Sequence, residues 1–527
     1  MIRYAQLWAA DPDAWRAAAG DWRAGVGTLD RREAELASVG RRLAGDWTGP
    51  AGRAALGRLD GLGRAMSDGR PALLEADQLL SRFADRLDRA RALLGTAVSA
   101  AEGEGLAVDP RGAVSFGPAA PTGAEPGRAR AVEQIRAALT LAGDADAETA
   151  GRLTALARRT GPELPADAPA GAPAPGAAPA AVCRWWDGLG DAARAWFVAR
   201  APALVGRLDG LPAAVRDRAN RLLLGALRAE LLTRRLRLLT GHRPPWVAVE
   251  LSRLSRSLAG LDALSTRLAA PGRRAYLLGL DASADGRAVV AVGDPDAADT
   301  VLTYVPGMTA DLADAAGELS RVERVVDRCA ELAPADGAAG VLWLDYDAPD
   351  FLDEAARRAP ADTAAPGLHR FVAGLRAGHD GGPVRLTVLG HSYGSLVVGS
   401  TARLPGFAAD ALVLVGSPGV GVEHAADLGL PAGRVWATTA GDDPIQYAAR
   451  RPAGLLGDAL RPVGPPDLPP GWALAAPGRE LWFGRNPVDP AFGAGVFAGT
   501  PHGHGGYWDA GNPALDGMAR IVLGGHP

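Results

Sequence analysis

A glycine-flanked serine is the residue of this sequence best suited to act as a nucleophile. The pentapeptide GHSYG at residues 390–394 follows a short apolar run and precedes a second apolar stretch, Leu396–Val398. A serine held on a tight turn between a strand and a helix leaves room only for small residues two positions before and after it. The pattern therefore predicts a nucleophile elbow, from which the hydroxyl of Ser392 attacks a carbonyl carbon.

A carboxylate that can orient a catalytic histidine follows a later apolar run. Asp442 and Asp443 stand in the segment GDDPI, directly after RVWATTA at residues 434–440. Such a carboxylate holds the imidazole ring and stabilises its protonated form. We favour Asp443 and keep Asp442 as the alternative. Asp443 also fits a helix N-cap before Pro444, but one of its oxygens can cap while the other meets the ring.

Three histidines follow these carboxylates in the chain: His502, His504 and His526. We expect His526, next to the last residue, to be disordered. The glycines of HGHGG at residues 502–506 suit a loop that brings a ring over the serine. A surface histidine in a flexible loop is the structural alternative for both, and the residues themselves leave His502 and His504 open.

An oxyanion hole needs two backbone N–H groups directed at the developing negative charge. The residue after the nucleophile, Tyr393, is expected to supply one. The other is expected from the loop YVPGMT at residues 304–309, which follows the third predicted strand. Gly307 allows a tight turn there, so Met308 or Thr309 would be the donor.

Alternating strand and helix patterns surround these residues and predict an α/β fold with a largely parallel sheet covered by helices. Helical patterns over 310–332 and 351–358 separate several of the β-prone runs. The elbow follows the fifth of these runs, and the acid and the histidines come after it. The predicted strands are Tyr276–Leu280, Ala288–Val292, Val301–Val305, Val341–Asp345, Val384–Leu389, Ala411–Val415 and Arg434–Thr438.

The N-terminal part of the chain is predicted to be helical. Leucines recur at helical spacing through residues 1–105, and DWTGP at 46–50 marks a turn between two long antiparallel helices. Residues 107–116 fit a small hairpin or an extended tail, and 128–158 return to helical spacing. We therefore expect a helical domain over 1–160, a Pro/Ala/Gly-rich linker over 161–181, a helical segment over 182–270 that packs on or caps the catalytic domain, and a catalytic domain over 271–527.

Composition excludes several classes of protein. The net charge is −4 and the pI about 6.1, so nothing indicates binding to nucleic acid or to an anionic membrane. All 56 basic residues are arginine, which points to a GC-rich genome more than to phosphate binding. Cys183 and Cys329 are expected to be free structural thiols. No Cys/His cluster has metal-ligand spacing, and we expect neither a metal nor a cofactor.

We also expect neither a secretory signal nor a membrane-spanning segment. The first twenty residues show no secretory signal, and no run of apolar residues is long enough to span a membrane. We expect a cytoplasmic protein or one exported by a non-classical, type VII-like route.

Motifs spread over about 205 residues resemble a known family. YVPGMTADL, VLWLDYDAP, VLGHSYGSLV, LVLVGSPG, GDDPI and HGHGGYWD occur in this order between Tyr304 and Asp509. Together they resemble an actinobacterial α/β-hydrolase family catalogued as a domain of unknown function, which implies that fold. Upstream, CRWWDGL and LVGRLDGLPAAVRDRANRLLL are similar to the same family. Its Gly-His pair before Tyr-Trp implies His504 as the base, and its Gly-Asp-Pro-Ile turn implies Asp443 as the acid. Gly505 replaces a polar residue of the family pattern, and Asp442 is extra.

A second resemblance concerns the helical hairpin. Trp47-Thr48-Gly49, placed between two helices, resembles the WXG100 family of small secretion-associated proteins. The structural alternative is a hairpin with an aromatic plug at its turn. Self-association or a protein partner through these helices would fit either case.

These observations predict a serine hydrolase that cleaves an ester or lipid substrate through Ser392, His504 and Asp443. Residues 451–478 lie between acid and histidine and would form a lid, a pocket wall or an inert excursion. Two other functions stay open: an acyltransferase that uses the same triad, and a non-catalytic, secretion-linked binding protein on a hydrolase scaffold.

Overall fold

The computed structural model describes residues 2, 4–47, 49–160, 169, 171–174, 176–240, 246–380, 382–450, 472–474 and 480–527. The chain divides into two compact units. One comprises residues 1–163 with 236–243, and the other 164–235 with 244–527. Part of the predicted linker 161–181, Thr48 of the WTG motif and most of the candidate lid 451–478 lie outside the described residues. The predicted domain boundaries therefore stay predictions.

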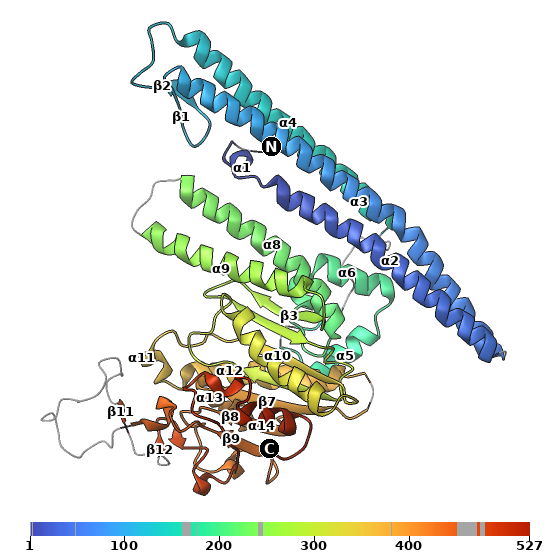
Figure 1. Ribbon diagram of the computed structural model, residues 1–527, viewed down its shortest axis with the longest axis vertical. Coiled ribbons are helices and arrows are strands. Elements are labelled where there is room, and N and C mark those ends of the chain that lie inside the picture. Colours follow the sequence, from blue (N-terminus) through green and yellow to red (C-terminus); the bar gives the residue numbers. More distant parts are fainter. Residues whose placement is uncertain are drawn as a thin grey trace, which may run out of the picture. The chain divides into compact units, whose positions relative to one another are not determined.

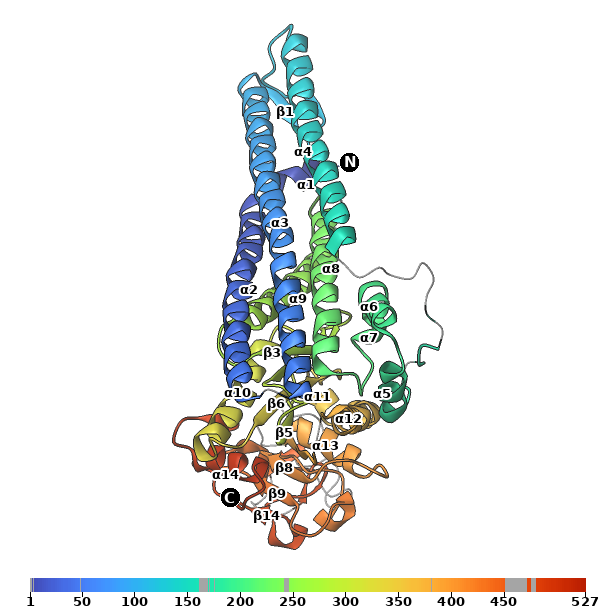
Figure 2. The same cartoon turned by 90° about the vertical axis from the view of Figure 1, so that its right-hand side faces the viewer.

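The first unit is built from three long helices. α2 (Pro12–Asp46), α3 (Pro50–Gly103) and α4 (Glu125–Thr160) run side by side in both views (Figures 1 and 2). Ion pairs join Arg23 to Asp77 at 2.8 Å and Arg70 to Glu33 at 2.8 Å, so α2 and α3 are antiparallel. A hairpin of β1 (Leu106–Val108) and β2 (Val114–Phe116) lies between α3 and α4 in the chain, and α1 (Tyr4–Trp8) precedes α2. Helices, turn and hairpin agree with the sequence pattern.

Trp47 lies at the turn of this helical hairpin, where its amide donates to Leu43 O at the end of α2. Trp47 is 48% exposed, and the alternative of an aromatic plug at the turn stays a prediction. The structure does not test the WXG100 resemblance further.

The second unit begins with helices and continues into a large sheet. Its first helices are α5 (Pro179–Asp187), α6 (Asp191–Arg200), α7 (Pro202–Val205), α8 (Ala213–Thr240) and α9 (Trp246–Ala269). Buried Asn220 of α8 donates to Leu277 O, at the first strand of the sheet. The helical segment before the sheet therefore packs on the sheet's edge.

Eight strands form the sheet in the order β14-β9-β8-β7-β5-β6-β4-β3. All neighbours are parallel except β3 with β4 and β4 with β6. Counted along the chain, the fifth strand of this sheet is β7, and it leads into the GHSYG turn, as predicted. The strands are β3 (Ala275–Asp281), β4 (Arg287–Val292), β5 (Thr300–Val305), β6 (Ala338–Leu344), β7 (Arg385–His391), β8 (Ala411–Val415), β9 (Val435–Thr438) and β14 (Gly495–Val496).

Helices cover both faces of this sheet, and Figure 2 shows α10 and α14 on one face and α12 on the other. The helices are α10 (Ala315–Leu332), α11 (Leu352–Ala355), α12 (Ala359–Gly378), α13 (Tyr393–Ala402) and α14 (Pro513–Val522). α10 begins five residues later than the predicted 310, because Asp311 accepts from the amides of Ala313 and Asp314 and holds a turn before the helix.

Smaller elements follow β9: β10 (Ala448–Arg450), β11 (Trp472–Leu474), β12 (Glu480–Leu481) and β13 (Gly484–Arg485).

Both cysteines are free, as expected. Cys329 is buried, and this burial raises the pKa of its thiol to about 12. Among the helices of the described residues, none is long and apolar enough to cross a membrane.

Candidate active site

Ser392 lies on a strained turn between β7 and α13. Its backbone has φ 53° and ψ −128°, in the left-handed half of conformational space that non-glycine residues rarely occupy. A Cβ on Gly394 would lie 2.3 Å from Val305 O, and one on Gly390 would lie 2.5 Å from the Cα of Ser395. Both flanking glycines are therefore required by the close approach of backbone, as the motif predicted.

Two further serines support this turn. Ser395 Oγ donates to Ser392 O at 2.6 Å and lies 2.7 Å from Ser417 Oγ. Because Ser395 is fully buried, these bonds satisfy its hydroxyl and tie the elbow to the loop after β8.

His504 and Asp443 meet at the carboxyl end of the sheet. Nδ1 of His504 lies 2.9 Å from both oxygens of Asp443, so the ring nitrogen donates to the carboxylate. Asp443 is fully buried, whereas the His504 side chain is 34% exposed. Asp443 Oδ1 also accepts from the amide of Ile445 at 2.9 Å, so the carboxylate contacts both the ring of His504 and a backbone amide of the following turn.

The other candidates occupy different places. Asp442 accepts from the amide of Gly503 at 2.9 Å and so anchors the loop rather than the ring. Nδ1 of His502 lies 3.2 Å from Asp509 Oδ2, and its side chain is 49% exposed. The expectation that His526 is disordered is wrong, because its ring packs at 5.4 Å against Trp436.

The loop after β5 lies directly against the nucleophile. A Cβ on Gly307 would lie 2.8 Å from the Cβ of Ser392, so only glycine fits there. The amide of Thr309 donates to Pro349 O at 2.8 Å, which leaves the amide of Met308 as the candidate oxyanion donor on this loop. Tyr393 begins α13, and its amide is the second candidate.

His391, inside the elbow, is a buried neutral ring. Its Nε2 lies 2.9 Å from His504 O, and its ring centre is 4.8 Å from that of His504. Burial first, and then the charges of His504 and Arg321, hold the pKa of His391 well below its usual value. Since a carbonyl only accepts, Nε2 of His391 carries the proton and anchors the backbone of His504.

Sequence reasoning missed two tyrosines at this site. Tyr507 donates to Asp443 Oδ2 at 2.5 Å, and Tyr346 donates to Pro306 O at 2.6 Å in the loop beside Ser392. Both tyrosines stand in motifs that carry the family resemblance, HGHGGYWD and VLWLDYDAP. Their place in these motifs was the only sequence signal for them.

Ser392 opens into a cavity of about 460 Å³ that is lined mostly by apolar side chains. Its lining includes Met308, Ala355, Tyr393, Ile445 and Phe483. Among the described residues, no group of three or more His, Cys, Asp or Glu is arranged to hold a metal ion. The arrangement supplies a strained hydroxyl, a histidine–carboxylate pair and backbone donors, which are the parts of nucleophilic acyl transfer.

Comparison with known proteins agrees with this architecture. A family model described as alpha/beta hydrolase matches residues 281–452. The uncharacterized protein Rv2079 of Mycobacterium tuberculosis is 30% identical over 380 residues, which are 65% of this chain and 55% of that protein. This chain therefore spans little more than half the length of that relative.

Two further comparisons cover a smaller share of this chain. The uncharacterized protein MT0992 of Mycobacterium tuberculosis is 37% identical over 192 residues, which are 34% of this chain and 70% of that protein. A solved structure titled esterase PE8 is 17% identical, covers 43% of this chain and 93% of that one, and has a TM-score of 0.26. The sheet topology and the family match agree with the predicted α/β-hydrolase fold. This chain belongs to the alpha/beta hydrolases, in a family that it shares with these mycobacterial proteins.

Proposed function

We propose that this chain is a serine hydrolase that cleaves carboxylic esters through Ser392, His504 and Asp443. The observation that carries the proposal is the pair of 2.9 Å contacts between His504 Nδ1 and buried Asp443, beside a serine whose φ is 53°. A buried carboxylate that holds one ring nitrogen leaves the other, Nε2, as a base for a neighbouring hydroxyl.

In the proposed reaction, Ser392 Oγ attacks the ester carbonyl carbon while His504 Nε2 takes its proton. The negative charge on the carbonyl oxygen is stabilised by the amides of Tyr393 and Met308. The bond between carbonyl carbon and alcohol oxygen then breaks, and His504 gives its proton to the departing alcohol. Water attacks the acyl-enzyme with His504 again as base, which releases the acid and restores Ser392.

The cavity supports an ester with an apolar acyl group. Its lining residues Phe483 and Tyr393 are only 6% and 3% exposed, so an acyl chain there would exchange water for packed apolar surface. Its volume of about 460 Å³ lies within the range of small-molecule sites.

An alkyl fluorophosphonate, which reacts with activated serines, tests the proposal on the full chain. Wild type is expected to be labelled and to hydrolyse p-nitrophenyl octanoate, and Ser392→Ala is expected to lose labelling and at least about 10³-fold in kcat. Ser400→Ala, on the same helix but hydrogen-bonded to Asp362, is the matched control and should keep both. Wild type that is neither labelled nor active would overturn the proposal.

A further inference from the structure

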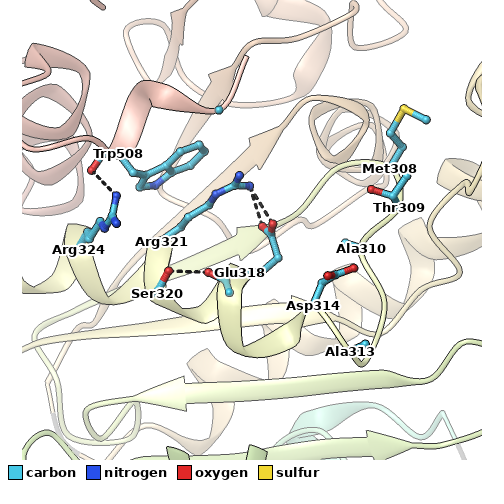
Figure 3. Close-up of a pocket in the computed structure, with 12 residues that line it drawn as sticks. Met308, Thr309, Ala310, Ala313, Asp314, Glu318, Ser320, Arg321, Arg324 and Trp508 are labelled. Carbon is cyan, nitrogen blue, oxygen red and sulfur yellow. Dashed lines mark hydrogen bonds and ion pairs between the residues drawn. The ribbon is translucent and has the colours of Figure 1, made fainter. Parts of the chain in front are cut away.

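A second, polar cavity adjoins the one that contains Ser392. It has a volume of about 610 Å³ and shares Met308, Thr309, Glu318, Arg321 and Gly505 with the apolar cavity. The rest of its lining includes the polar or charged side chains of Asp314, Ser320 and Arg324. Figure 3 shows this cavity, with Trp508 and Arg324 on one side and Met308 and Thr309 on the other. The remaining lining residues are Ala310, Ala313, Asp314, Gly317, Ser320, Arg324 and Trp508.

The polar cavity lies where the alcohol part of the ester would be placed in the proposed reaction. In the proposed reaction His504 protonates the alcohol oxygen, so the alcohol must lie beside that ring. Gly505, the residue after His504, lines both cavities, and a Cβ on it would lie 3.8 Å from Arg321. A substrate with its acyl chain in the apolar cavity would therefore extend its alcohol past Gly505 into the polar one.

The charges of the polar cavity favour a neutral alcohol. Two arginines, Arg321 and Arg324, face two carboxylates, Asp314 and Glu318, in its lining. Arg321 Nη1 lies 2.9 Å from both oxygens of Glu318, which also accepts from Tyr304 at 2.6 Å. An anionic alcohol would compete with Glu318 for Arg321 and be repelled by Asp314.

The hydroxyl groups of an alcohol can bind both the arginines and the carboxylates of the polar cavity. Arg324 donates to Trp508 O at 3.2 Å and its side chain is still 53% exposed, so it has further N–H groups to offer. A hydroxyl can accept from such a guanidinium and donate to a carboxylate such as Asp314.

We infer that the substrate is an acyl ester of an uncharged, polyhydroxylated alcohol, such as glycerol or a sugar, whose hydroxyls bind between α10 and the loop that carries His504. This inference deepens the proposed function and rests on it. It assigns Asp314, Glu318, Arg321 and Arg324 to the recognition of the alcohol.

Two esters that share one acyl chain test the inference on the full chain. Monooctanoylglycerol and propyl octanoate have the same carbon skeleton and differ only in two hydroxyl groups. Wild type is expected to prefer the glycerol ester by about 10-fold or more in kcat/KM, because hydroxyls that find partners strengthen binding in the transition state.

Filling the polar cavity should remove this preference. Gly317 is exposed at the start of α10, and nothing lies within 4 Å of a Cβ built on it, so Gly317→Trp places a ring there without a backbone clash. This variant should lose about 10-fold in kcat/KM for the glycerol ester and stay within about 2-fold for the propyl ester. Gly225→Trp, at an equally open position on α8, is the matched control. Arg324→Gln is a milder second variant, expected to act in the same direction.

The outcomes separate this inference from the proposed function. Fluorophosphonate labelling of Ser392 releases only fluoride, so it should proceed at the same rate in Gly317→Trp. A wild type that is labelled but shows no preference for the glycerol ester would overturn the inference alone. Faster cleavage of the phosphorylated ester, octanoylglycerol phosphate, would overturn the choice of a neutral alcohol. Absence of labelling in wild type would overturn both.

Discussion

Tyr507 and His504 bind the same carboxylate from two sides. The phenol of Tyr507 donates to Asp443 Oδ2 at 2.5 Å, and Nδ1 of His504 lies 2.9 Å from that same oxygen. The phenol oxygen also accepts from the amide of Ala440 at 3.0 Å. Burial first, and then Asp443, raise the pKa of Tyr507, so the phenol stays protonated and Asp443 is fixed as an acceptor.

Tyr507→Phe is expected to weaken catalysis through Asp443. Loss of a hydrogen bond to a charged group corresponds to about 1.5–3 kcal/mol, so kcat should fall roughly 10- to 100-fold with little change in KM. Tyr276→Phe is the matched control, because Tyr276 lies on β3 and its substitution removes a phenol bond of 3.1 Å to Asp294. Steady-state kinetics on both variants check this. Equal kcat in Tyr507→Phe and wild type would show that Tyr507 has no positioning role.

Substitutions of the two adjacent aspartates, Asp442 and Asp443, should have very different effects on kcat. Asp443→Asn is expected to lower kcat by about 10³–10⁴-fold, since an amide cannot hold the ring in the required tautomer or stabilise its charge. Asp442→Asn should stay within about 3-fold, because an amide oxygen can still accept from Gly503. Ester hydrolysis by the two purified variants measures the difference. The opposite ranking would assign the orienting role to Asp442.

Gly394→Ala is expected to destabilise the catalytic unit. Its methyl group would lie 2.3 Å from Val305 O and 2.4 Å from Pro306 O, and neither carbonyl can move freely. Overpacking of this kind costs about 1–3 kcal/mol or more, and the Tm should drop by roughly 5 °C or more. Gly225→Ala, at an exposed position of α8, should instead stabilise by about 0.5–1 kcal/mol. Calorimetry of both variants and of wild type measures these changes in Tm. An unchanged Tm for Gly394→Ala would contradict the packing described for the elbow.

A buried carboxyl away from the active site should make stability pH-dependent. Burial first raises the pKa of Asp296 to about 6, with Asp294 and Asp380 adding to the effect and Ala213 N–H and Arg216 opposing it. Between its ordinary value of 3.8 and about 6, the folded state binds more protons than the unfolded state. Stability is therefore expected to fall as pH rises through this window, by up to about 3 kcal/mol.

Asp296→Asn removes this dependence and keeps an oxygen that can accept from the amide of Ala213. The variant should unfold at a higher Tm than wild type at pH 7 and lose this advantage near pH 4. Thermal unfolding at both values provides the measurement. A Tm difference that is the same at both pH values would contradict the prediction.

Much of the fold was predictable because its causes are local. Short apolar runs that alternate with helical spacing indicated all seven strands from β3 to β9, and these lie within a few residues of their predicted bounds. The start of α10 was predicted too early, because apolar spacing does not reveal that Asp311 turns the chain before the helix. The short strand β14 was missed because two residues carry no periodicity.

The glycines on either side of Ser392 could be predicted from local chemistry. Gly390 and Gly394 are needed because backbone approaches them within 2.5 Å of a possible Cβ, and that requirement is visible in the pentapeptide. The order of elbow, acid and histidine along the chain is also a property of the sequence alone.

Which side chains meet is a different matter, because it depends on packing between segments far apart in the chain. Asp442 and Asp443 are adjacent in sequence, yet one binds the amide of Gly503 and the other the ring of His504, 61 residues away. In the same way, the contact of Thr309 with Pro349 and that of Tyr507 with Asp443 exist only once the loops at the carboxyl edge of the sheet are folded together. Residue types and spacing predicted which side chains belong to the candidate site. The three-dimensional arrangement of these loops decides which of them form hydrogen bonds with one another, because a hydrogen bond needs atoms within about 3 Å.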